Sequence, residues 1–264
     1  MEPSVEAGRP AVSFRIGGSD LTRRLVRLTV IRSSLGGEYA ALEVENSDGR
    51  VAPLLRDRAP ARLDWFRPGE PARALFGGFV DSHDLDETAH VILKPGSPVF
   101  WRDGFAHARS SGDIRQTLSG IWQDAKVHHL PGPAAGWSIA FGDHTRDAAL
   151  DSLLHAAAFS APRADWQVTR WFDTGGILHI GDPMLAPSAP QVRIAYGTNI
   201  IARRHTGEGI FEAECPAAFG IEIGQRVRVE DPVSGVSADG RVLMAIDTWD
   251  ARRARTDLAM RFMQ

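Results

Sequence analysis

The sequence has very little cysteine: Cys215 is the only one among 264 residues. No disulfide can form within the chain, so no disulfide framework defines its fold. Cys215 ends the largely apolar run 210–215, and a free cysteine in such a run commonly behaves as a small hydrophobic residue. We therefore expect a strand residue here, not a nucleophile.

Long apolar runs are missing as well. No stretch approaches the ~18 residues that a membrane-spanning helix needs, and residues 1–14 lack the apolar core of a secretory signal. We expect no membrane-spanning segment and a protein that is made in a cytosol and stays soluble there. The formal net charge of −3 argues against a dedicated nucleic-acid binder, which usually carries a basic patch, but not against a channel for nucleic acid.

Catalytic motifs are absent too. The sequence contains no G-x-S-x-G elbow, H-E-x-x-H pair, P-loop or C-x-x-C pair. Adjacent histidines rarely share a metal, and the spacing of zinc ligands is missing. We therefore expect solvated loop histidines, and neither a metal nor a cofactor. The side chains considered as metal ligands are His107, His128, His129, Asp143, His144 and His155.

Two other groups of side chains suggest binding without establishing it. The acidic stretch with Asp81, Asp84, Asp86 and Glu87 lacks the turn glycine of a calcium loop, which favours a solvated loop or an anionic surface. Seven tryptophans could form a sugar-binding platform, but their scatter through separate segments favours packing in cores and interfaces. They are Trp65, Trp101, Trp122, Trp137, Trp166, Trp171 and Trp249.

What the sequence does contain is β pattern in its first third. Val12, Phe14 and Ile16 alternate with polar neighbours, and turn clusters separate this run from similar ones. Several short strands with turns between them predict a small barrel or sandwich. The predicted strands cover residues 12–16, 25–31, 39–45, 62–66, 74–80 and 91–93.

The pattern becomes helical after residue 110. An apolar stripe from Ile114 to Ala125, through Trp122, predicts one helix with Ser110 as its N-cap. Thr145 is the expected N-cap of a second helix. The predicted elements after the first helix are a loop over 128–136, a strand over 137–141, the helix from 145 to 161, and strands over 164–172 and 177–180.

A second β region follows a proline-rich linker over residues 184–190. This second β module is expected to be roughly the size of the first. Its last two strands should form a long hairpin across residues 248–251. The predicted strands cover 192–195, 200–204, 209–215, 226–230, 240–247 and 255–262.

Several segments, taken in order, resemble the tail-hub proteins of contractile phage tails and related injection particles, the baseplate-hub or late-control-D class. Residues 74–80 resemble the family's L-F-x-G-x-V strand, and residues 110–118 resemble the start of its first helix. Residues 145–154 resemble its second helix, and residues 176–181 the following G-x-L-x-I-G hairpin end. Residues 219–229 resemble the G-x-x-V-x-V strand entry. The order of these segments carries the resemblance, which covers nearly the whole chain.

The resemblance implies an α+β, β-rich fold class, with two small tail-tube-like β-barrel domains flanking an α+β insert. We expect an N-terminal arm over 1–11, a first barrel over 12–95, the insert over 96–183 and a second barrel over 184–264. No spike or lysozyme domain is expected after the second barrel.

The function that the resemblance implies is structural and not enzymatic. Such a hub would form a homotrimer, and its two barrels per chain would give a pseudo-sixfold ring between a hexameric tail tube and a trimeric spike. The implied partners are the tail tube protein, the central spike protein and other baseplate proteins, with DNA only as non-specific cargo in the channel. The implied location is a virion tail baseplate or injection particle, assembled in the cytoplasm of a bacterial host.

Ring closure removes unpaired strand edges, so the long C-terminal hairpin is our candidate inter-subunit strand. Asp81, Asp84 and Asp86 are candidates for facing the lumen or a partner, since a mildly anionic lumen would repel DNA phosphates. Two alternatives stay open: a tail-tip cell-wall hydrolase and a carbohydrate-binding β module. The hairpin candidates are Val242, Met244, Ile246, Leu258, Met260 and Phe262.

Overall fold

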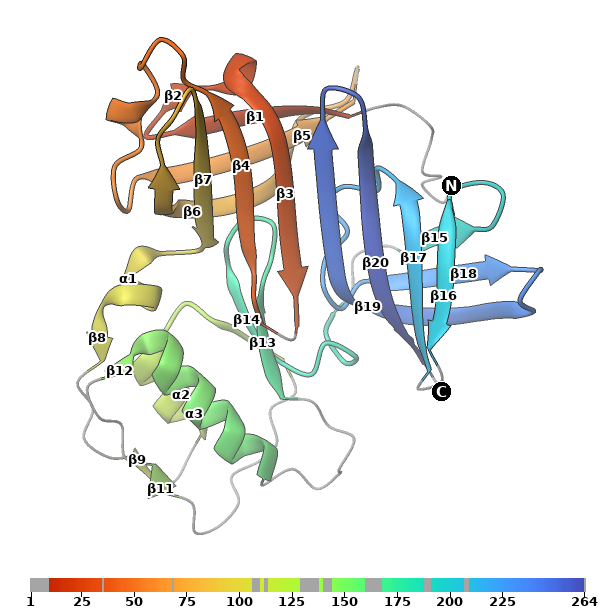
Figure 1. Ribbon diagram of the computed structural model, residues 1–264. Coiled ribbons are helices and arrows are strands. Elements are labelled where there is room, and N and C mark those ends of the chain that lie inside the picture. Colours follow the sequence, from red (N-terminus) through yellow and green to blue (C-terminus); the bar gives the residue numbers. More distant parts are fainter. Residues whose placement is uncertain are drawn as a thin grey trace.

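Most of the structure is one curled sheet of 13 strands that forms a half-barrel (Figure 1). Along the chain the elements fall into a first β unit, a middle segment that holds the α-helices, and a second β unit. The computed structural model describes residues 10–34, 36–67, 69–105, 110–111, 114–128, 138–139, 144–159, 168–187, 191–206 and 209–263.

The first β unit follows from a side-chain period of two. In β4, for example, Ala40, Leu42 and Val44 are buried and the residues between them are half-buried. The unit comprises β1 (Ala11–Ile16), β2 (Ser19–Asp20), β3 (Leu25–Ser33), β4 (Tyr39–Glu45), β5 (Pro60–Phe66), β6 (Arg73–Asp84) and β7 (Thr88–Pro95), with 3-10 turns η1 (Thr22–Arg24) and η2 (Ala52–Leu54).

The middle segment, which we define as residues 98–181, contains the described α-helices. Thr145 caps the longest of them, because its hydroxyl accepts the backbone N–H of Ala148 at 3.3 Å. Asp147 lies in the first turn, where the helix dipole favours a carboxylate. The elements are α1 (Pro98–Arg102), β8 (Gly104–Phe105), β9 (Ser110–Ser111), α2 (Ile114–Ile121), β10 (Lys126–His128), β11 (Ser138–Ile139), β12 (His144–Thr145), α3 (Arg146–Phe159), β13 (Thr169–Phe172) and β14 (Leu178–Gly181).

The second β unit repeats the alternation of the first. In β17, Phe211, Ala213 and Cys215 are buried between half-buried neighbours. The strands are β15 (Val192–Ala195), β16 (Ala202–Thr206), β17 (Ile210–Pro216), β18 (Arg226–Asp231), β19 (Val236–Asp250) and β20 (Ala254–Phe262).

The two β units share one strand order. Neighbouring strands run β3-β4-β7-β6-β5-β1 in the first unit and β16-β17-β20-β19-β18-β15 in the second. With β2 set aside, the six strands of each unit correspond one to one in chain order. The corresponding pairs are all antiparallel except the last, since β1 lies antiparallel to β5 and β15 lies parallel to β18. The chain therefore builds nearly the same sheet twice.

The correspondence reaches single residues in β6 and β19. Gly78 and Gly240 each lie opposite the last residue of the following strand, β7 or β20. Two residues later, after Val80 and after Val242, the pairing register with that strand shifts by one residue. Such a bulge bends a strand and increases its twist. Both strands are therefore bent at the same place.

Strand β19 joins the two units. Its residues 236–241 pair with β18, and residues 244–250, beyond the bulge, pair with β3 of the first unit. At the bulge, the carbonyl of Leu243 accepts the N–H of Ser34 at 2.9 Å and its hydroxyl at 3.2 Å. Figure 1 shows β19 beside β3 at the centre of the sheet. We call the β19–β3 pairing the internal seam, because it makes the two sheets continuous.

Each part of the chain also has its own apolar core. Phe14 and Leu63 are fully buried in the first unit, Phe211 and Met260 in the second, and Phe100 in the middle segment. The middle segment also contacts both units through specific hydrogen bonds. Glu38 and Glu222, one from each unit, accept hydrogen bonds from that segment's hairpin around 172–174.

Most predicted strands of both β regions are confirmed to within a few residues. The first predicted helix is shorter than expected, because α2 ends at Ile121 and Ser110 pairs in β9 instead of capping the helix. His128, expected in a loop, ends β10, a strand parallel to β14. The division into two barrels and an insert stays a prediction. None of the described helices is both long enough and apolar enough to cross a bilayer.

Candidate assembly surface

Both β cores lie on one face of the continuous sheet, and we call the opposite side the open face. Cross-strand register places one row of side chains across the middle of this face, through the internal seam. The row consists of Glu214, Asp257, Ile246, Ile31 and Tyr39, each directly opposite the next. None of these five side chains is fully buried. The open face is therefore continuous from the second unit to the first.

A second row runs parallel to the first, from the internal seam to β6. It consists of Asp250, Arg27, Glu43, His90 and Asp84. Carboxylates outnumber guanidinium groups in the two rows taken together. The open face thus combines apolar and acidic side chains, and two arginines form ion pairs with its carboxylates: Arg27 with Glu43, and Arg255 with Glu214 and Asp257.

A hollow of about 370 Å³ lies on the open face of the second unit. Arg204, Glu212, Ala259 and Met244 line it, each directly opposite the next across β16, β17, β20 and β19. The hollow mixes charged and apolar groups and lies beside the edge of the sheet.

The two outer strands of the second unit differ in how their edges are covered. The side chain of Asn199 blocks β15: its carbonyl oxygen accepts the N–H of Ala195 at 2.6 Å, and its amide donates to the carbonyl of Arg193 at 3.1 Å. An unpaired strand edge otherwise invites pairing with another chain. Strand β16 pairs with β17 alone among the described strands, so its outer edge is open for such pairing.

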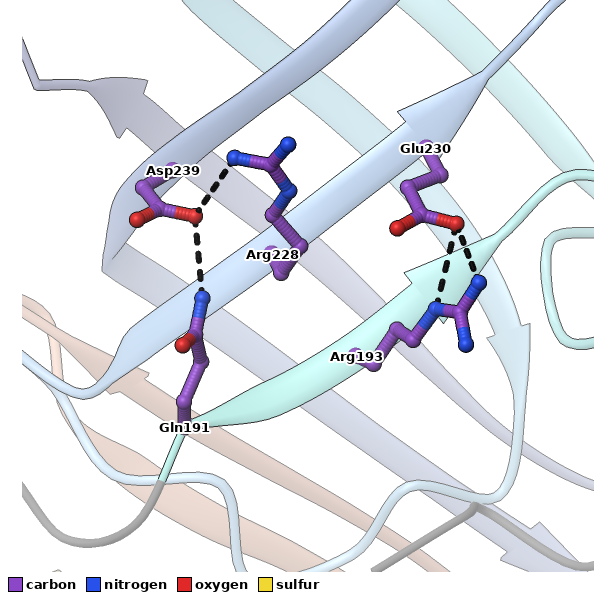
Figure 2. Close-up of a pocket in the computed structure, with 5 residues that line it drawn as sticks. All are labelled: Gln191, Arg193, Arg228, Glu230 and Asp239. Atoms are coloured by element: carbon purple, nitrogen blue, oxygen red, sulfur yellow. Dashed lines mark hydrogen bonds and ion pairs between the residues drawn. The ribbon is translucent and has the colours of Figure 1, made fainter. Parts of the chain in front are cut away.

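A polar hollow of about 340 Å³ lies on the β15–β18–β19 sheet, and Figure 2 shows its lining. Arg228 and Gln191 donate to the carboxylate of Asp239 at 3.1 and 2.9 Å. Arg193 binds the carboxylate of Glu230, with its Nε at 3.1 Å. Because these groups satisfy one another, the network ties the parallel strand β15 to its neighbours and does not resemble a ligand site.

The predicted inter-subunit hairpin lies at the centre of the sheet. Both edges of β19 and β20 pair within the chain, so this hairpin forms the internal seam and offers a second subunit no free backbone edge in the described part. Sequence alone could not reveal β3 as its partner. Val242, Leu258 and Met260 are buried in the core, whereas Met244, Ile246 and Phe262 are half-buried.

The three predicted acidic residues are separated by the structure. Asp81 pairs with Arg102 at 2.8 Å and ties β6 to α1. Asp84 is exposed at the end of β6 on the open face, opposite His90. Asp86 is exposed in the turn to β7, where its carboxylate accepts the N–H of Glu87 at 2.9 Å. The side chains of Asp84 and Asp86 are therefore exposed, whereas that of Asp81 is held in an ion pair. That Asp84 and Asp86 face a partner or the lumen stays a prediction.

The structure brings His128 to a histidine that sequence reasoning missed. Its Nε2 lies 2.9 Å from Nδ1 of His179, whose Nε2 lies 3.1 Å from the carboxylate of Asp173. Trp171 stacks on both rings. These contacts fix the β13–β14 turn against β10. No spacing motif links residues 128 and 179, so no sequence signal pointed to this pair.

The other candidate metal ligands do not assemble. His155 is exposed on α3, and His144 lies in β12, away from the His128 pair in sequence and sheet. His107, His129 and Asp143 lie outside the described residues. Within the described ranges, no group of three or more His, Cys, Asp or Glu side chains is arranged to hold a metal ion.

The tryptophans and the cysteine contribute mainly to packing. Trp65 and Trp171 are buried, and Trp122 is half-buried, which disfavours an exposed sugar platform for these three. Trp137 and Trp166 lie outside the described residues. Cys215 is fully buried, and burial raises the pKa of its thiol to about 12, so the thiol stays protonated and unreactive at neutral pH.

Several solved structures of other proteins share this architecture. No family model and no curated protein matches the chain. A tail protein of prophage MuSo2 from Shewanella oneidensis has a similar structure, with a TM-score of 0.67 and 13% identity over 95% of this chain and 97% of that one. A tail protein from Neisseria meningitidis MC58 matches with a TM-score of 0.62 and 12% identity over 96% of both chains.

A third similar structure belongs to an E. coli component of the type VI secretion system that exhibits structural similarity to the T4 bacteriophage tail proteins gp27 and gp5. Its TM-score is 0.63, with 11% identity over 95% of this chain and 77% of that one. At such identities the likeness concerns the fold. The resemblance noted in the sequence is confirmed at that level: the chain has the fold of phage and prophage tail proteins.

Proposed function

We propose that this chain is a structural tail or baseplate hub, which assembles as a homotrimer around a channel. The observation that carries the proposal is the repeated strand order, because two equivalent β units per chain give three chains six equivalent units. Such a ring matches a six-fold tube on one side and a three-fold spike on the other. The tail-protein fold of the similar structures supports the same role.

In this proposal the domains are the N-terminal arm over 1–11, tail-tube-like barrels over 12–95 and 184–264, and an α+β insert over 96–183. The open face lines the channel. Its carboxylates repel the phosphates of DNA, so DNA or an effector passes without binding. The insert lies outside the ring and contacts other baseplate proteins.

The proposed partners are the tail tube protein, the central spike protein and further copies of this chain. The proposed location is the tail baseplate of a virion or an injection particle, assembled in the bacterial cytoplasm. No catalytic role is proposed, because the His128–His179–Asp173 chain packs against Trp171 and no nucleophile is seen beside it among the described residues.

Light scattering coupled to size exclusion tests the proposal directly. The purified protein should have three times the protomer mass, and electron microscopy should show a ring with six lobes. A protein that stays monomeric at high concentration, and binds neither a tube protein nor a spike protein, would overturn it.

A further inference from the structure

The internal seam shows how one unit pairs with the next. Strand β19 uses the same edge for two partners: β18 before its bulge and β3 beyond it. The bulge supplies the change of direction that separates the two pairings. A seam of this kind needs a strand that continues past its bulge and an open edge strand to receive it.

Strand β6 of the first unit has the same design. Residues before its bulge pair with β5, as β19 pairs with β18. Beyond the bulge, Ser82, His83 and Asp84 pair with β7 on one edge. No described strand occupies their other edge, and all three side chains are exposed. This edge corresponds to the part of β19 that forms the internal seam.

The receiving strand also has an equivalent. Strand β3, which receives β19, corresponds in strand order to β16 of the second unit. The outer edge of β16 is open among the described strands, and Ala202 and Arg204 on it are exposed. Each chain thus carries one β6 edge, over residues 82–84, and one receiving strand, β16, that no other described strand uses. The neighbouring Asp81 carbonyl accepts a hydrogen bond from Arg102 of α1, so the available β6 edge begins at Ser82.

We propose that residues 82–84 of one chain pair antiparallel with β16 of a second copy, which repeats between chains the seam that β19 and β3 form within a chain. The contact joins two different surfaces of the chain. Repeated contacts of this kind close into a ring when the rotation from one copy to the next is a whole fraction of a full turn, such as one third for a trimer. This inference rests on the proposed trimer and specifies which strands form the junction between neighbouring chains.

The internal seam also predicts the register of the junction. Ile246 lies opposite Ile31 in the seam, and the matching bulges make Asp84 the equivalent of Ile246. Strand pairing makes Thr206 the equivalent of Ile31, since each lies opposite the first residue of the next strand, Tyr39 or Ile210. Asp84 of one chain is therefore placed opposite residue 206 of the next.

Charge supports this pairing. Asp84, Asp86 and Glu87 give the β6–β7 hairpin an acidic tip, whereas Arg204 is an exposed cation on β16, two residues before position 206. The same mapping that pairs residues 84 and 206 brings the turn with Asp86 toward Arg204. Opposite charges across neighbouring strands favour pairing and suppress wrong partners.

A disulfide between copies tests the register. Directly opposed strand residues have Cα atoms about 4.5–5.5 Å apart, which suits a disulfide. The double variant Asp84→Cys/Thr206→Cys should give covalently closed trimers on mild oxidation. The matched control, Asp84→Cys/Ala202→Cys, places the thiols four residues out of register and should give little cross-linking. Native Cys215 is buried and should not interfere.

Charge reversal gives a second, independent test. Arg204→Glu should weaken trimer formation at least about tenfold, because it sets like charges against the acidic hairpin, and adding Asp84→Arg and Asp86→Arg should restore it. Arg252→Glu, a reversal at another exposed arginine, serves as the control and should leave the trimer intact.

The two proposals fail in different ways. A monomeric wild-type protein that binds no tail component overturns the hub assignment. A wild-type trimer in which residues 84 and 206 do not cross-link, and Arg204→Glu has no effect, retains the hub and overturns this junction.

Discussion

Arg32 of β3 and Asp247 of β19 form an ion pair inside the internal seam, with 2.5 Å between Nη2 and Oδ2. The two side chains are 3% and 0% exposed, so the pair is withdrawn from water. Arg32 also donates to the carbonyl of Leu75 at 3.2 Å, and Thr256 donates to Asp247 at 2.6 Å. These hydrogen bonds compensate part of the cost of burying two charges.

Removing one partner of this pair should be costly. Arg32→Met leaves the Asp247 carboxylate buried without its cation, and the free energy of unfolding should fall by about 3–5 kcal/mol. The double variant Arg32→Met/Asp247→Leu removes both charges and should lie closer to wild type. Urea denaturation measures both values. A single variant no less stable than the double variant would contradict this account of the seam.

Glu38 should make stability depend on pH. Burial raises the pKa of this carboxyl to about 8. The hydrogen bond from the Phe172 N–H and the nearby Arg170 guanidinium lower the pKa, but by less than burial raises it. In the unfolded chain this carboxyl has its ordinary pKa of 4.5. Between pH 4.5 and about 8, the folded state therefore binds one proton more than the unfolded state does. The contribution of Glu38 to stability is therefore greatest below pH 4.5 and falls as the pH rises towards 8.

Glu38→Gln removes this dependence and keeps an acceptor for the Phe172 N–H. At pH 8.5 its melting temperature should exceed that of wild type by at least about 2 °C, with the difference disappearing near pH 4. Calorimetry across that range measures it, with Glu43→Gln on the open face as the control. An equal difference at both pH values would show that Glu38 is not protonated in the fold.

Gly78 and Gly240 correspond in the repeat but differ in the space around them. A Cβ on Gly78 would lie 1.9 Å from the carbonyl oxygen of Lys94, whereas one on Gly240 would lie 3.0 Å from that of Arg261. Gly78→Ala should therefore cost about 1–3 kcal/mol, as overpacking usually does, and Gly240→Ala should cost less. Chemical denaturation of the two variants compares them, and the reverse order would contradict the geometry.

Asn199 should protect β15 from pairing with other molecules. Asn199→Ala removes the two hydrogen bonds that this side chain makes with the N–H of Ala195 and the carbonyl of Arg193, at a cost of about 0.5–1.5 kcal/mol each. The uncovered edge should also increase aggregation on mild heating, measured by light scattering. Thr198→Ala, in the same turn, should change neither property. An Asn199→Ala protein as stable and as soluble as wild type would rule out the capping role.

The strands were predictable because local alternation and turn residues mark them. The run with Phe211, Ala213 and Cys215 is a strand by its own pattern, and Thr145 caps its helix as expected. Pairing between distant strands leaves no such local signal. The same alternation in β3 and β19 does not say that these strands pair, so the seam was missed and the hairpin was assigned to an interface.

The candidate site was predicted in part for the same reason. Asp84 and Asp86 lie at an exposed hairpin tip, as an acidic surface loop should, but Asp81 is drawn into an ion pair by α1, a short helix that the pattern did not indicate. Whether the outer edge of β16 is open depends on where all the other strands lie in the sheet. Only the complete strand order identifies it.

The internal seam also imposes an order on synthesis. Arg32 and Asp247 are 215 residues apart, so at roughly 5–20 residues per second β3 waits about 10–40 s on the ribosome for its partner. During that interval β3 is an unpaired edge with an arginine on its core-facing side. An inward-pointing charge discourages wrong strand pairing, so we expect Arg32 to protect the edge of β3 until Asp247 is synthesised and neutralises it.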